Sequence, residues 1–112
     1  SEQIGNTEMN TIRQHAVTDV KFAGSYMGLV RQAAEDDRQY FTPKIQQFAE
    51  QASFHAKNVA TGFRQMMQAI AAGDLEKAKT HLDVLQREGA NLQYCSERVQ
   101  MLVLLEKQKK NT

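Results

Sequence analysis

The chain has 112 residues, which is enough for one domain with a modest hydrophobic core and too few for a second folded domain. Lys and Arg number 14 against 13 Asp and Glu, and the net charge of +1 creates no long-range field to attract nucleic acid or an anionic membrane. The longest apolar stretch, 101–105, is far shorter than the ~20 residues of a membrane-spanning helix. We therefore expect one soluble domain over 1–112, with no nucleic-acid or membrane partner.

The first predicted element is a helix over 7–38. Asn6 or Thr7 can cap it, and Glu8 follows in the first turn, where a carboxylate complements the helix dipole. Its apolar and small residues recur at helical spacing at Met9, Ile12, Ala16, Val20, Ala23, Met27, Val30 and Ala34. A second stripe consists of Phe22, Tyr26, Leu29 and Ala33, as expected if the helix contacts two neighbours. Because the carboxylates at 35–37 oppose the dipole of a helix C-terminus, an end before them is the alternative.

The second and third predicted elements form a helical hairpin. Thr42 followed by proline predicts the start of a helix over 43–72. Gly73 then ends this helix and Asp74 caps a third helix over 74–108. The core stripe of the second helix is Ile45, Ala49, Ala52, Ala56, Val59, Phe63, Met66 and Ile70. The core stripe of the third is Leu75, Ala78, Leu82, Leu85, Gly89, Leu92, Ser96, Val99 and Val103.

Gly89 decides whether the chain forms three helices or four. The apolar stripe keeps its register through Gly89, so we expect one long helix there. The alternative is a break at Gly89 with Asn91 starting a fourth helix, because glycine costs ~1 kcal/mol relative to alanine inside a helix. Short links force neighbouring helices to run antiparallel. The predicted fold class is all-α, an elongated antiparallel bundle of three long helices, or four if the chain breaks near Gly89.

Three histidines and one cysteine match zinc in number but not in position. At ~1.5 Å per residue, His15 and His81 lie near the hairpin end of an up-down-up bundle, while His55 and Cys95 lie well toward the other end. No H-x-x-x-H or C-x-x-C pair occurs. We therefore expect no metal site within one protomer and no cofactor, and we expect Cys95 to be a buried packing residue. Metal binding by histidines and Cys95 across a dimer interface is the alternative.

His55, with Lys57 and Gly62 after it, is similar to the phosphoaccepting histidine of histidine-phosphotransfer domains. That family places lysine and glycine three and four residues after the histidine, where this chain has Asn58 and Val59. The resemblance implies a signalling bundle in which His55 carries a phosphoryl group. We keep this, together with metal sensing, as the alternative function.

The sequence contains no glycine-flanked nucleophile serine, phosphate-cradling glycine loop or dinucleotide fingerprint, so we expect no enzyme and no catalytic residues. The lone Cys95 cannot form an internal disulfide, which fits the cytoplasm as the expected location. No signal segment opens the chain, but Ser1 can be a trimmed end, so export stays open.

Candidate binding residues lie at the end of the third helix. Residues 99–105 are apolar almost all round, and a helix of that kind needs burial on both sides. The predicted partner-binding residues are Tyr94, Met101, Leu104 and Leu105, with Phe54 from the polar face of the second helix. Alternatively, the first helix or a break at Gly89 covers this end within the monomer. Gly24 and Gly28, four residues apart, add a small-residue track that lets another backbone approach.

Two-fold dimers are the commonest oligomers of soluble proteins, and a helix face can pair with itself. We therefore expect a homodimer, with docking of another protein's helix as the other way to bury this face. The function predicted from the sequence is a non-enzymatic helical adaptor or regulatory protein that acts by protein binding.

Overall fold

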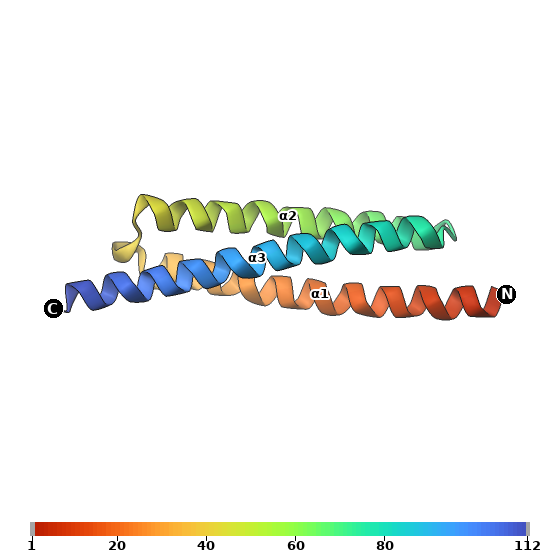
Figure 1. Cartoon of the computed structure of the whole chain (residues 1–112), viewed down its shortest axis with the longest axis horizontal. Helices are drawn as coiled ribbons and strands as arrows, with labels where there is room; N and C mark the ends of the chain where they lie inside the picture. The colour runs from red at the N-terminus through yellow and green to blue at the C-terminus, as the bar shows by residue number, and fades with distance from the viewer. Residues whose placement is uncertain (1, 112) are drawn as a thin grey trace.

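The computed structural model describes residues 2–111, and the side chains of residues 5–111, as an elongated antiparallel bundle of three long helices (Figure 1). Helix α1 spans Glu2–Asp36, a short 3-10 turn η1 spans Arg38–Tyr40, α2 spans Pro43–Ala71 and α3 spans Leu75–Lys110. The bundle measures 66 × 18 × 17 Å, and residues 2–111 contain no strand. The predicted all-α fold of three long helices is confirmed.

The predicted start of the first helix was wrong. Helix α1 begins at Glu2, five residues before the predicted boundary, so Asn6 and Thr7 lie inside the helix instead of capping it. These residue types permit a helix to begin but do not force it, and no proline precedes them. Thr7 also takes part in a contact within the helix, in which its carbonyl accepts a hydrogen bond from the Thr11 hydroxyl at 3.1 Å.

The C-terminal end of α1 also differs from the prediction. The helix ends at Asp36, two residues before 38, and it contains Glu35, so an end before the acidic cluster is also wrong. The next residue, Asp37, forms an ion pair with Lys107 of α3 at 2.9 Å. This contact places a cation where the carboxylates and the helix dipole concentrate negative charge.

The predicted signals around the two links are confirmed. The Thr42 hydroxyl oxygen accepts a hydrogen bond from the Ile45 amide at 3.2 Å. Gly73 adopts a positive φ of 73°, which a residue with a side chain rarely tolerates. The Asp74 carboxylate then accepts the Lys77 amide at 3.0 Å. These local contacts fix where α2 begins, where it ends and where α3 begins.

The hydrophobic core repeats every seven residues. On α3, the side chains of Ala78, Leu85, Leu92 and Val99 are all fully buried. On α2, the buried set is Ile45, Ala52, Val59 and Met66. Cys95, Ser96 and Val103 on α3 and Gly62 and Ala69 on α2 are also buried, whereas Phe63 is only partly buried against the core. A seven-residue apolar repeat is the pattern of helices packed as in a coiled coil.

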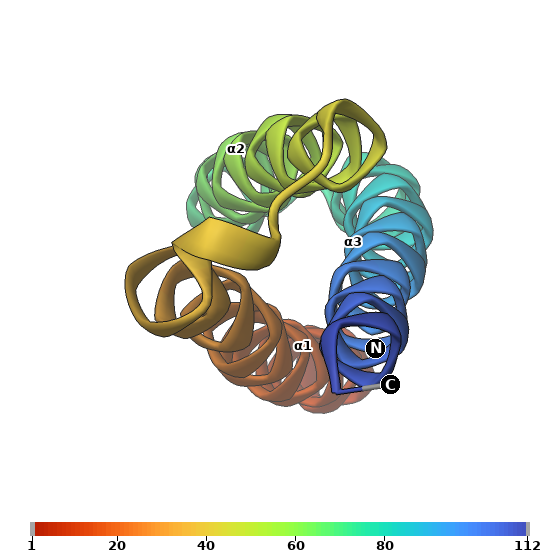
Figure 2. The ribbon, with the colours of Figure 1, turned by 90° about the vertical axis from the view of Figure 1, so that its left-hand side faces the viewer.

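Gly89 lies inside an unbroken α3, so the predicted single helix is correct and the alternative of a break at Gly89 is wrong. The contact between α2 and α3 is the most extensive, and α1 contacts α3 more extensively than it contacts α2. Viewed along the long axis, the three helices are arranged around a common axis, and η1 crosses from α1 towards α2 (Figure 2). Ser96 donates a hydrogen bond to the Tyr26 carbonyl at 3.0 Å, which joins α3 to α1.

Among residues 2–111, no helix combines the length and apolar character needed to cross a bilayer.

Candidate functional site

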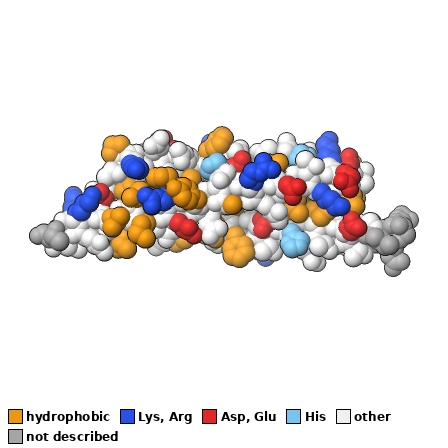
Figure 3. Space-filling model, in the orientation of Figure 1, with side chains coloured by type: hydrophobic (Ala, Val, Ile, Leu, Met, Phe, Trp, Pro, Cys, Tyr) orange, Lys and Arg blue, Asp and Glu red, His pale blue; other side chains and the backbone are white. Residues whose placement is uncertain are grey.

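The main candidate site is a group of exposed apolar side chains on the C-terminal half of α3. The exposed fractions are 58% for Tyr94, 50% for Met101, 50% for Leu104 and 43% for Leu105. We call these four residues the α3 apolar surface. In the space-filling view, hydrophobic side chains gather over the C-terminal half of α3 (Figure 3). The structure therefore brings together four of the five residues predicted to bind a partner.

Only part of the apolar run at 99–105 is used by the core. Val99 and Val103 are buried and Leu102 is partly buried, because they lie on the sides that face the other helices. Neither α1 nor a break in α3 covers Met101 and Leu105. The interpretation that this end is covered within the monomer is therefore wrong.

Two residues that the sequence analysis missed extend this surface. The ring of Phe48 on α2 packs edge-on against Tyr94, with 6.2 Å between ring centroids. The Arg98 guanidinium lies 5.7 Å from the centroid of the same Phe48 ring. Spacing alone places Tyr94 and Arg98 on one face of α3, since they are four residues apart. Nothing in the local sequence pairs either of them with Phe48, because that contact depends on how α2 and α3 are aligned.

Phe54, the fifth predicted residue, is exposed but lies apart from the α3 apolar surface. Its neighbour His55 contacts Glu88, so Phe54 is level with the part of α3 that precedes Tyr94. At ~1.5 Å per residue, it is about 8 Å along the bundle from Tyr94, the near end of that surface, and more than about 20 Å from Leu105. Its ring packs edge-on against His55, with centroids 5.3 Å apart. Phe54 is therefore not counted in the α3 apolar surface, and its role in partner binding stays a prediction.

His55 and Cys95 are both mostly buried within the helical bundle. The Nδ1 atom of His55 hydrogen-bonds the Glu88 carboxylate, and both side chains are mostly buried between α2 and α3. Cys95 is buried as predicted, and its burial raises the pKa of the thiol above the usual 9.0. Among the described residues, no three His, Cys, Asp or Glu side chains are grouped closely enough to hold a metal ion.

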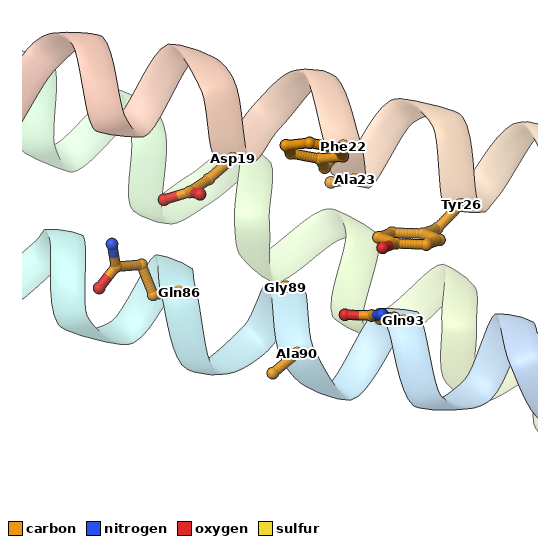
Figure 4. A pocket seen from close by; sticks show the side chains of 8 residues that line it. All are labelled: Asp19, Phe22, Ala23, Tyr26, Gln86, Gly89, Ala90 and Gln93. Atoms are coloured by element: carbon orange, nitrogen blue, oxygen red, sulfur yellow. The ribbon is translucent and has the colours of Figure 1, made fainter.

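A second candidate site is a pocket of about 310 Å³ between α1 and α3, which we call the α1–α3 pocket (Figure 4). Its lining residues are Asp19, Phe22, Ala23, Tyr26, Gln86, Gly89, Ala90 and Gln93. The sequence analysis assigned Phe22 and Tyr26 to contacts between helices and treated Gly89 only as a possible break. That these residues line one pocket follows only from the alignment of the parallel helices α1 and α3.

The two glycines of the predicted small-residue track, Gly24 and Gly28, have different surroundings in the structure. Gly24 lines a shallow recess between α1 and α2, together with Met27, Arg31 and Ala56. Gly28 is exposed, and a Cβ added at either glycine would meet no heavy atom within 4 Å. Close packing inside the protomer therefore does not require glycine at these two positions.

No protein-family model, curated protein or solved structure matches the chain. The fold defines its class as an elongated antiparallel three-helix bundle with two candidate sites on its surface.

Proposed function

We propose that this protein is a non-enzymatic helical adaptor or regulator, acting in the cytoplasm by protein binding, and that it forms a homodimer through the α3 apolar surface. The observation that carries the proposal is the exposure of Tyr94, Met101, Leu104 and Leu105, each by about half, on one continuous helix. Contiguous apolar side chains that remain in water mark interaction sites on folded proteins. Burying them against the same face of a second copy removes that area from water on both protomers at once.

Charge favours an antiparallel arrangement of the two α3 helices. The last turn of α3 carries Lys107, Lys109 and Lys110. Lys107 and Lys109 are paired with Asp37 and Glu106, so in a parallel arrangement the repulsion between the two copies comes mainly from Lys110. Antiparallel pairing separates these ends and sets Tyr94 of one protomer opposite Leu105 of the other, since they lie at the two ends of the surface.

Light scattering over a concentration series tests the proposal. We expect the mass to rise from monomer to dimer, and Leu105→Asp to remain monomeric because a carboxylate would be buried in the interface. Val84→Asp is the matched control, since Val84 is 38% exposed on the same helix and distant from the surface. Both variants should keep the helical circular dichroism of the wild type. A wild-type protein that stays monomeric, or equal dimerisation of both variants, would contradict the homodimer.

The same fractions test the alternative of a signalling or sensor bundle. That function requires phosphohistidine or bound zinc that disappears in His55→Ala. The His55 imidazole is mostly buried and its Nδ1 atom already contacts Glu88. The sensor function therefore has less support than protein binding, which rests on the exposed α3 apolar surface. Detection of phosphohistidine or bound zinc at His55 would favour the sensor function over protein binding.

A further inference from the structure

The α1–α3 pocket contains a carboxylate without a partner. Asp19 is partly buried on α1, and its Oδ2 atom is buried with no hydrogen-bond partner among the described residues. The ion pairs of residues 5–111 do not include Asp19. A buried carboxylate oxygen is normally paired or hydrogen-bonded, because removing it from water is costly. The pocket therefore offers an uncompensated negative charge to whatever binds there.

Two aromatic rings lie on the same face of α1 as this carboxylate. Phe22 and Tyr26 follow Asp19 by three and seven residues, a spacing that aligns side chains along one side of a helix. The Phe22 ring is 58% exposed, although a large apolar ring is normally covered. Aromatic faces attract cations and also contact apolar groups. Ring and carboxylate together therefore select a positively charged ligand with an apolar body.

Helix α3 supplies space and neutral acceptors on the opposite wall. Gly89 has no side chain, and a Cβ added there would meet no heavy atom within 4 Å. Gln86 and Gln93 lie about one turn to either side of it. Figure 4 shows Asp19 and Gln86 towards one end of the pocket and Tyr26 and Gln93 towards the other, with the Gly89 backbone between them.

We propose that the α1–α3 pocket binds a small primary organic ammonium, with Asp19 as its counter-ion and the Phe22 and Tyr26 rings against its apolar body. An ammonium group has three hydrogen-bond donors, and the Asp19 carboxylate and the Gln86 amide oxygen are the acceptors at that end of the pocket, while Gln93 lies at the other end beside Tyr26. None of the eight lining residues is Lys, Arg or His, so the lining has no cationic side chain to balance the charge of an anion. A volume of about 310 Å³ is at the lower end for ligand pockets, which limits the ligand to a small molecule.

This site does not depend on dimerisation, because every lining residue belongs to one protomer. Ligand binding and association through the α3 apolar surface are therefore measured separately, and either can fail without the other.

A titration followed by amide NMR tests the proposal on the full chain. The probe is phenethylammonium chloride, at constant chloride concentration, and its neutral counterpart of similar size is 2-phenylethanol. We expect saturable shifts at the amides of Ala23, Gly89 and Ala90 with the ammonium, and binding at least about tenfold weaker for the alcohol, since a charge-assisted hydrogen bond is lost.

Asp19→Asn keeps the shape of the side chain and removes its charge. It should weaken binding of the ammonium about tenfold or more, whereas Asp83→Asn, at an exposed carboxylate of α3 outside the pocket, should leave it unchanged. Gly89→Leu fills the pocket and should abolish the shifts, which keeps the test decisive if Asp19→Asn does not fold. Equal binding of the alcohol, equal binding by Asp19→Asn, or no saturable shift at these amides would overturn the proposal.

Discussion

Leu85 lies where the α2 backbone at Gly62 packs closely against α3, and replacing it with alanine tests the packing of the bundle. Its side chain is fully buried at the centre of the seven-residue repeat. Opposite it lies Gly62, where an added Cβ would be 3.4 Å from the Leu85 Cβ. Because the backbone of α2 already lies against Leu85, the helices cannot close further on the space that Leu85→Ala leaves.

The cost of this substitution has two parts. Moving a leucine side chain out of water contributes about 1.5–3 kcal/mol, and an unrelaxed cavity adds to the loss, so buried Leu→Ala changes cost about 2–5 kcal/mol. We expect about 3 kcal/mol for Leu85→Ala. For a chain of this size, that loss corresponds to roughly 12 °C in Tm.

Urea unfolding followed by circular dichroism at 222 nm measures the free energy of unfolding, at a protein concentration low enough to keep the chain monomeric. Leu29→Ala is the control, because it makes the same exchange in a helix at a side chain that is 41% exposed on α1. It should cost less than about 1 kcal/mol, with an unchanged dependence on urea. Equal costs for the two variants would refute the assignment of the core face of α3.

Three further predictions use the same protein. Asp74→Ala should lower the free energy of unfolding by about 1 kcal/mol through loss of the helix cap, measured by urea unfolding against the exposed control Asp83→Ala. Gly89→Ala should raise it by about 0.5–1 kcal/mol, because alanine favours a helix interior and its Cβ has open space; a loss of stability in the same assay would contradict that geometry. Cys95 should react with iodoacetamide at pH 8 much more slowly in the folded chain than in urea, since burial raises the pKa of the thiol and limits access; equal rates would contradict its burial.

Local sequence signals predicted most of the fold. Thr42, Gly73 and Asp74 act within one helical turn, so their effect on helix ends follows from the neighbouring residues alone. The start of α1 was missed because Asn6 and Thr7 are compatible both with a cap and with a helix interior, and no local feature excludes the second.

The candidate sites were predictable only in part. Helical periodicity placed Tyr94, Met101 and Leu105 opposite the core stripe, and their exposure follows because no helix covers that side. Periodicity could not tell how far Phe54 lies from that surface, since it describes positions on one helix and not distances between helices. The contact of Phe48 with Tyr94 could not be predicted for the same reason, because the two rings belong to different helices.

By itself, the sequence determined that the chain forms three long helices, where α2 begins and ends, and which stripe of each helix faces the core. Each of these depends on a helical period, a cap or a turn, which acts between residues a few positions apart. Only the tertiary structure decided which side chains remain uncovered and that Asp19, Phe22 and Gly89 share a pocket. Those relations depend on the relative alignment of helices whose contacting residues are about 70 positions apart along the chain, as Tyr26 and Ser96 are, and no local pattern encodes that alignment.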